Sequence, residues 1–212
     1  MKHLLIIGAR GFGREIYYSA IESIGYGTEF DVKGFLDDKA DALEGYAGYP
    51  SIISSVEDYE IQSDDVFICA LGDVHWKRHY VQKILDKGGE FITLIHNSAY
   101  VSKNVKIGIG CIILAGCRVH CDVAIGDFTT IQPYVVIGHD CHIGNMCQFN
   151  SNTMLGGFVT VEDDVTLHTS AILLPKAKVH ANAVVGAGSV VLRSVKANTT
   201  VFGNPAVPVT SK

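Results

Sequence analysis

A large apolar residue recurs at every sixth position through the second half of the chain. The period starts at Ile95 and continues to residue 196 without a change of register, which makes seventeen successive hexads. Aliphatic residues and one phenylalanine fill the first position, the fifth position is almost always small or β-branched, and glycine recurs at the second. Neither the 3.6-residue period of a helix nor the alternation of an ordinary strand fits this spacing.

The period of six predicts short strands joined by tight corners, with one large side chain per strand pointing into a shared core. Three such edges make a triangular coil of about eighteen residues, so residues 95–196 are expected to form about six coils of a parallel β-helix. A single coil cannot bury its own apolar side chains, and stacking on the neighbouring coils supplies the missing contacts.

The hexad register also assigns most of the six cysteines. Four of them occupy the small fifth position, where a free cysteine behaves as a small hydrophobic residue: Cys111, Cys117, Cys141 and Cys147. Cys69 falls in an apolar run, and only Cys121 lies at a turn position. Cys117, His120 and Cys121 are close enough in sequence for a zinc site. The register turns Cys117 inward, however, and this disfavours zinc.

Residues 1–94 lack the period of six and alternate between strand-like and helix-like patterns. Strands are expected at 3–7, 30–36, 66–71 and 90–95, and helices at 12–24 and 74–87. This alternation favours a parallel sheet with crossover helices. About ninety residues are enough for half of a dinucleotide-binding fold, so we expect a small Rossmann-like domain.

A glycine-rich loop, residues 8–13, joins the first predicted strand to the first predicted helix. This is the right context for a phosphate-binding turn. The glycine spacing is G-x-x-G-x-G, whereas dinucleotide-binding proteins have G-x-G-x-x-G, and this weakens the case for NAD. Asp37 and Asp38 follow the next strand, at the end where open α/β sheets bind ligands. The alternative for this pair is a solvated turn.

One histidine stands out because of its neighbours in the coil. Residues eighteen apart stack on the same edge, and this places Gly157 one coil away from His139 at a corner. The missing side chain leaves space beside the imidazole, and Asp140 follows directly in the sequence. A carboxylate orients a catalytic histidine in this way. An exposed His-Asp pair in a solvated turn is the alternative.

The composition excludes several classes of protein. Hydrophobic residues make up 48% of the chain and charged residues 18%, which argues against disorder. The net charge is −5 without a basic run, so nucleic acid is not an expected partner. No apolar run approaches the ~20 residues of a membrane span, and the N-terminus lacks the unbroken apolar stretch of a signal peptide. We therefore expect a cytoplasmic protein that binds neither a membrane nor nucleic acid.

Several segments together resemble one family of enzymes. They are residues 6–15, 34–38 and 94–99 in the first half and residues 136–141, 185–191 and 201–206 in the second. In this combination the chain resembles the sugar acetyltransferases grouped with sialic acid O-acetyltransferase, which include the N-acetyltransferases of bacterial UDP-4-amino-sugar pathways. The resemblance covers essentially the whole chain, in the same domain order.

The resemblance implies a homotrimer in which each chain contributes a left-handed β-helix. Residues 1–94 would bind a nucleotide-sugar, and residues 95–212 would form the acyltransferase domain with a C-terminal closing segment. Acetyl-CoA would be the acyl donor, bound between neighbouring β-helices, and no metal would be required. The expected reaction is acetylation of an amino group on the nucleotide-activated sugar.

The resemblance also implies roles for individual residues. His139 would be the general base and Asp140 its acidic partner, while small residues would line the coenzyme groove: Gly157, Ala187 and Gly188. In the first half, the substrate would meet the glycine turn and the acidic pair: Gly8, Gly11, Phe12, Asp37 and Asp38.

The sequence departs from the family pattern at three positions, and it leaves other functions open. Phe12 replaces a usual histidine, Gln148 replaces a second active-site histidine of some relatives, and Gln132 replaces an asparagine. A sialic acid or related sugar hydroxyl could be the acceptor instead of an amine, or the chain could bind a nucleotide-sugar without catalysis. A metal-dependent hydratase would need three converging histidines, which His120, His139 and His142 do not obviously provide.

Overall fold

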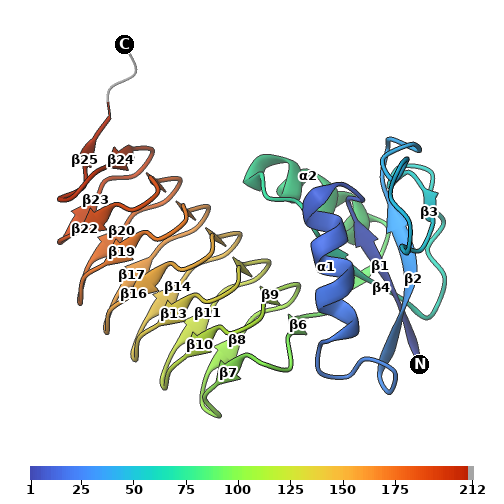
Figure 1. Ribbon diagram of the computed structural model, residues 1–212, viewed down its shortest axis with the longest axis horizontal. Coiled ribbons are helices and arrows are strands. Elements are labelled where there is room, and N and C mark those ends of the chain that lie inside the picture. Colours follow the sequence, from blue (N-terminus) through green and yellow to red (C-terminus); the bar gives the residue numbers. More distant parts are fainter. Residues whose placement is uncertain (210–212) are drawn as a thin grey trace. The chain divides into compact units, whose positions relative to one another are not determined.

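The computed structural model describes residues 1–209 and divides into two compact units, Met1–Asn97 and the part of the chain from Ser98 onward. Figure 1 shows the first unit in blue to green and the second in green to red. The division lies shortly after the expected boundary at residues 94 and 95. Within residues 1–209, no helix combines the length and the apolar character needed to cross a membrane.

The first unit contains a parallel five-stranded sheet with the order β3-β2-β1-β4-β5. Its strands are β1 (Lys2–Ile7), β2 (Phe30–Leu36), β3 (Ile52–Ser54), β4 (Asp65–Cys69) and β5 (Glu90–Phe91). β1 lies in the centre and pairs with both β2 and β4. β4 is buried throughout and β1 is buried from Leu4 to Ile7, which explains the continuous apolar runs in these two strands. The predicted Rossmann-like sheet is confirmed.

Two helices connect the parallel strands, α1 (Gly11–Ile21) and α2 (Val74–Asp86). The side chain of Asp73 caps α2 by accepting a hydrogen bond from the backbone N–H of Trp76 at 3.0 Å. α1 ends three residues earlier than predicted, and Ile24 is 61% exposed beyond it. The predicted strand at 90–95 is divided into β5 and a second short strand, β6 (Leu94–Ile95).

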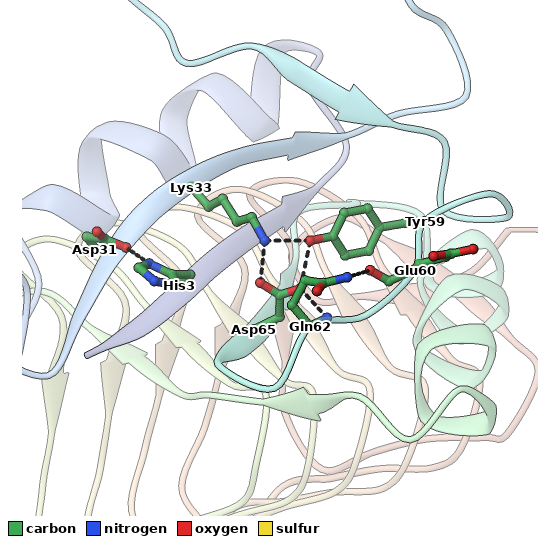
Figure 2. A network of polar contacts seen from close by, with 7 residues as sticks. All are labelled: His3, Asp31, Lys33, Tyr59, Glu60, Gln62 and Asp65. Carbon is green, nitrogen blue, oxygen red and sulfur yellow. Dashed lines mark hydrogen bonds and ion pairs between the residues drawn. The ribbon is translucent and has the colours of Figure 1, made fainter.

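A buried polar network stands at the start of β4 (Figure 2). Asp65 accepts hydrogen bonds from Lys33 Nζ at 2.7 Å, from the Tyr59 hydroxyl at 2.6 Å and from the backbone N–H of Gln62 at 2.8 Å. Burial alone would raise the pKa of Asp65, but these three donors lower it below its usual value. Burial likewise opposes the charge on Lys33, yet its bonds to Asp65 and Tyr59 raise the pKa of the amine.

We expect Asp65→Asn to lower the free energy of unfolding by about 2 kcal/mol, the scale of lost hydrogen bonds to a charged group. The contribution of Asp65 to the free energy of unfolding is fully present above the pKa that the carboxyl has in the unfolded chain. It is lost as the pH falls through the lower pKa that the carboxyl has in the folded protein. The Lys33 contribution is present below the unfolded pKa of the amine and is lost as the pH rises through the raised folded pKa. Urea unfolding at acidic and neutral pH measures the Asp65 effect, and unfolding at alkaline pH measures the Lys33 effect.

The neighbouring Asp64→Asn provides the control for this prediction, because Asp64 is exposed. It should match the wild type at every pH, whereas the loss in Asp65→Asn should shrink as the solution is acidified. An Asp65→Asn variant as stable as the wild type at neutral pH would contradict a stabilising role for the network.

The second unit is a left-handed parallel β-helix built from very short strands. One sheet contains β7 (Tyr100–Val101), β10 (Arg118–Val119), β13 (Val136–Ile137), β16 (Met154–Leu155), β19 (Ile172–Leu173) and β22 (Val190–Val191). The next contains β8 (Lys106–Ile107), β11 (Ala124–Ile125), β14 (His142–Ile143), β17 (Thr160–Val161), β20 (Lys178–Val179) and β23 (Ser194–Val195). The third has eight strands, among them β9 (Ile112–Ile113), β12 (Thr130–Ile131), β15 (Gln148–Phe149), β18 (Thr166–Leu167), β21 (Val184–Val185), β24 (Thr200–Phe202) and β25 (Val207–Pro208).

The pairing register of the β-helix is eighteen residues, as in Val136 opposite Met154 and Met154 opposite Ile172. The predicted β-helix is therefore confirmed. Two of the sheets have six strands each and the third has eight, so the strand count departs from the expected six or so coils only in the third sheet. β25 is also antiparallel to β24.

The core of the β-helix contains the side chains that the register turned inward. The four predicted inward cysteines are fully buried, and Cys69 is buried in the first unit. Each inward thiol donates to a carbonyl oxygen fifteen residues further along, as Cys141 does to Gly156 at 3.1 Å. Burial raises the pKa of Cys117 and Cys141 to about 11. These thiols therefore stay protonated and serve packing.

The corners of the β-helix use a left-handed backbone at the fourth position of the hexad. Most of these residues are not glycine, and their φ angles lie near +60°. Aspartate and asparagine adopt this conformation readily, whereas bulky residues do so rarely. Three corners nevertheless hold an aromatic residue: Phe128, Tyr134 and Phe158.

Candidate functional site

A cavity of about 590 Å³ opens at the carboxyl ends of β1, β2 and β4 in the first unit. This is the edge at which open α/β sheets bind ligands. Of the residues predicted for substrate binding, Gly8, Phe12, Asp37 and Asp38 line this cavity. Gly11 lines an adjoining cavity of about 570 Å³ instead.

The glycine loop brings the start of α1 close to the end of β1. Gly8 has φ +95°, a conformation that side chains disfavour. A Cβ atom on Gly13 would lie only 1.9 Å from the carbonyl oxygen of Gly8, so this contact between helix and loop requires glycine. The unusual glycine spacing thus serves close packing, and it leaves the N-terminus of α1 beside the cavities.

The two aspartates after β2 have different surroundings. Asp37 uses both carboxylate oxygens on backbone N–H groups, those of Ala9 at 2.8 Å and Lys39 at 2.9 Å. Asp38 accepts a hydrogen bond from the hydroxyl of Tyr80. Asp37 therefore shapes the loop, whereas one oxygen of Asp38 has no hydrogen-bond partner among residues 1–209.

Tyr80 and Trp76 belong to the cavity although the sequence did not single them out. Both rise from the first turns of α2, and Trp76 is 52% exposed. Burial and the bond to Asp38 raise the pKa of Tyr80 to about 12, so the phenol remains a donor. The predicted topology could have indicated Trp76 and Tyr80, because α2 starts just after the buried strand β4 ends, at the edge of the sheet where ligands bind.

Positive charge lines the boundary between the two cavities. Arg10 and Lys39 line both of them, and the second also contains Arg14, Tyr46 and the acidic Asp41 and Glu44, of which Asp41 lies 3.3 Å from Lys39 Nζ. The guanidinium of Arg14 lies 3.6 Å from the centre of the Tyr46 ring, which fixes its position. Arginine and lysine beside a helix N-terminus favour a phosphate or another anion.

The second unit brings together His139, Asp140 and Gly157 at one corner. Asp140 Oδ2 lies 2.7 Å from His139 Nδ1, and both side chains are partly exposed. When Nδ1 holds the proton and donates it to Asp140, Nε2 is left as an acceptor. A Cβ atom on Gly157 would lie 2.7 Å from Nε2 and Cε1 of His139, so the imidazole occupies the space that glycine leaves.

The remaining predicted residues of the second half lie elsewhere. Ala187 and Gly188 are exposed at the corner that precedes β22, whereas the His139 corner follows β13. One chain therefore does not bring these two residues to His139. Gln148 lies on β15 and Gln132 directly follows β12, and this sheet contains neither β13 nor β14, the strands that flank the His139 corner.

Metal-ligating side chains do not converge in the described part of the chain. No group of three histidine, cysteine, aspartate or glutamate side chains within residues 1–209 is placed to hold a metal ion. Cys117 is buried and Cys121 is exposed, so the zinc site that the sequence left open does not form.

Comparison with known proteins matches both units to described domains. Residues 3–84 match the model of the PglD N-terminal domain, and residues 92–186 match the model of the GMPPB C-terminal domain. A UDP-N-acetylbacillosamine N-acetyltransferase of Bacillus subtilis is 32% identical over 119 residues, which cover 54% of this chain and 52% of that protein. The chain therefore spans about half the length of this curated relative in the alignment.

Two solved structures resemble the chain over nearly its whole length. PerB from Caulobacter crescentus, in complex with CoA and GDP-perosamine, is 27% identical with a TM-score of 0.89, covering 99% of this chain and 98% of that one. The acetyltransferase domain of PglB from Neisseria gonorrhoeae is 25% identical with a TM-score of 0.90, covering 99% and 100%.

The matched proteins, the cavity of the first unit and the His139 corner of the second together define a class of proteins. Members of this class consist of a small α/β domain followed by a hexapeptide-repeat β-helix. Within that class, the order of the two domains and the matched relatives both agree with the nucleotide-sugar N-acetyltransferases. The chain is similar in both of its units to bacterial nucleotide-sugar N-acetyltransferases. The resemblance found in the sequence is confirmed.

Proposed function

We propose that this protein transfers an acetyl group from acetyl-CoA to an amino group of a nucleotide-activated sugar. The His139–Asp140 pair carries the proposal, because it supplies a base whose ring is oriented by Asp140 and packs directly over Gly157. PerB, which shares the fold over nearly the whole chain, was solved with CoA and GDP-perosamine. The cavity in the first unit provides a place for the nucleotide.

The reaction needs a base and a site that holds the two substrates together. The uncharged amine attacks the thioester carbonyl, and Nε2 of His139 takes the proton that the nitrogen loses as the new C–N bond forms. The C–S bond then breaks, and the proton passes to the thiolate of CoA. Asp140 stabilises the imidazolium during the transfer. Backbone N–H groups at the corner would bind the developing oxyanion.

The cavity of the first unit suits the nucleotide part of such a substrate. Asp38, held by Tyr80, offers an acceptor to a base that carries an N–H group. The N-terminus of α1 at Gly11, together with Arg10 and Lys39, would hold the diphosphate. Asp37 keeps the loop in place through its two backbone hydrogen bonds. Gly8 and Phe12 complete the wall of the cavity.

We further propose that the protein acts as a homotrimer, with acetyl-CoA in a groove between neighbouring copies. Gly157 and the pair Ala187–Gly188 belong to different corners of one β-helix, so they can line a single groove only if they come from two copies. The sheet that contains β13 supports this, because its outer surface carries a row of apolar side chains that are partly exposed: Val136, Met154, Ile172 and Val190. Light scattering measures the number of copies.

All six cysteines are free thiols in the structure. Free thiols persist in a reducing compartment. We propose that the enzyme works in the cytoplasm.

A fluorescence and thiol-release screen tests the proposed function. Trp76 is the only tryptophan of the chain and lines the cavity, so its fluorescence reports binding there directly. We expect UDP- or GDP-linked amino sugars to change this fluorescence and to release CoA from acetyl-CoA. Release with free sialic acid instead would indicate O-acetylation. Binding without any release of CoA would indicate a nucleotide-sugar binding protein and would contradict the proposal.

A further inference from the structure

Aromatic side chains at the left-handed corners of the β-helix fold back over the preceding coil. A Cβ atom on Gly110 would lie 2.3 Å from the ring of Phe128, and one on Gly116 would lie 2.6 Å from the ring of Tyr134. Each of these two rings therefore covers a glycine eighteen residues earlier. An aromatic residue at this position thus packs against whatever the preceding coil presents.

Phe158 occupies the same position at a third corner, where the residue eighteen positions earlier is Asp140, and the ring of Phe158 contacts the imidazole of the residue before it, His139. The ring centres of Phe158 and His139 lie 5.1 Å apart with an interplanar angle of 87°, an edge-to-face contact. The backbone N–H of Phe158 also donates to the carbonyl oxygen of His139 at 2.9 Å. Phe158 is 52% exposed, so the contact with His139 is not a consequence of burial in the core.

Without Phe158, the imidazole would be held by one hydrogen bond only. Asp140 fixes the direction of Nδ1, but more than half of the His139 side chain is exposed, so the ring is free to swing toward solvent. Gly157 cannot oppose such a movement because it has no side chain. The edge-to-face contact is the second restraint on the ring, and it keeps Nε2 above Gly157.

We propose that Phe158 is a positioning residue for His139, an inference that rests on the proposed function of His139 as the general base. Phe158 affects the geometry of proton transfer by His139 and leaves the affinity for acetyl-CoA and nucleotide-sugar unchanged. The contact is specific to this corner, because the rings at the other two aromatic corners cover glycines.

The kinetic test compares substitutions at Phe158 with a matched substitution at Tyr134. Phe158→Ala should lower kcat about tenfold, the upper range of what an aromatic pair contributes, with KM for both substrates unchanged. Phe158→Tyr keeps the ring and should restore kcat. Tyr134→Ala removes an aromatic side chain from the same backbone conformation at another corner, and it should leave kcat at the wild-type value.

Two kinetic outcomes would overturn the proposal. One is full kcat in Phe158→Ala. The other is an equal loss of kcat in Tyr134→Ala, which would show that truncation at any aromatic corner disturbs the β-helix as a whole.

A second measurement does not depend on turnover. The measurement is the NMR spectrum of protein with isotope-labelled histidine. The ring signals of His139 are identified as those that are missing from the spectrum of His139→Gln. The ring of Phe158 shifts these signals in the wild type, and Phe158→Ala should remove the shift while Tyr134→Ala preserves it. A wild type without acetyl transfer would contradict the proposed function alone, whereas unchanged His139 signals in Phe158→Ala would contradict the positioning role.

Discussion

Replacement of His139 by alanine is expected to lower kcat by roughly 10²–10⁴-fold, the contribution of a positioned general base. The side chain lies at a corner and is about half exposed, so its removal leaves no cavity in the core. The variant should therefore unfold at the same temperature as the wild type and retain its oligomeric state. A thiol-release assay at saturating acetyl-CoA measures kcat.

His142→Ala is the matched control, because His142 is an exposed histidine of the same coil, on the strand that follows the corner. It should keep the turnover of the wild type. Equal turnover in His139→Ala and in the wild type would contradict the assignment of the base, and unfolding of His139→Ala would contradict the purely catalytic role.

Substitution of Gly157 is expected to have the next largest effect. In Gly157→Ala the new methyl group would lie 2.7 Å from two atoms of the imidazole, closer than van der Waals contact allows. The imidazole must then move away, and a displacement of about 1 Å reduces turnover on the order of 10²-fold. The same assay measures the loss, and circular dichroism checks that the β-helix remains folded.

A graded series separates displacement of the imidazole from general damage at the corner. Gly157→Val should lose more turnover than Gly157→Ala, while the hydrogen bond between His139 and Asp140 persists in both. Full activity in Gly157→Ala would show that turnover does not require the imidazole to pack directly over Gly157.

The hexad period predicted the β-helix and the His139 corner correctly because both follow from counting. A side chain's direction in a β-helix depends only on its position in the hexad, so His139, Asp140 and Gly157 could be placed together without knowledge of any contact. The inward cysteines followed from the same count. The strand β2 was also predicted with its observed bounds, because apolar residues bounded by turn residues leave little choice.

Other features depend on contacts between residues far apart in the sequence. β3 has only three residues and is defined by its pairing with β2, which no local pattern reveals. The different surroundings of Asp37 and Asp38 depend on Ala9 and on Tyr80, which is 42 residues away from Asp38. Phe158 escaped notice because the sequence does not show toward which coil a corner side chain folds.

The register of eighteen residues also limits how the length of this chain can change. Loss or gain of one residue within the β-helix would turn every later side chain from the core to the surface until the register recovered. A change of six would restore the core but move each later residue to the next corner, and if it fell between residues 139 and 157, His139 would no longer face Gly157. Only a change of eighteen, a whole coil, preserves both core and corners, and it preserves the contact of His139 with Gly157 only outside residues 139–157. The β-helix can therefore change length only in whole coils if its packing and its site are both to survive.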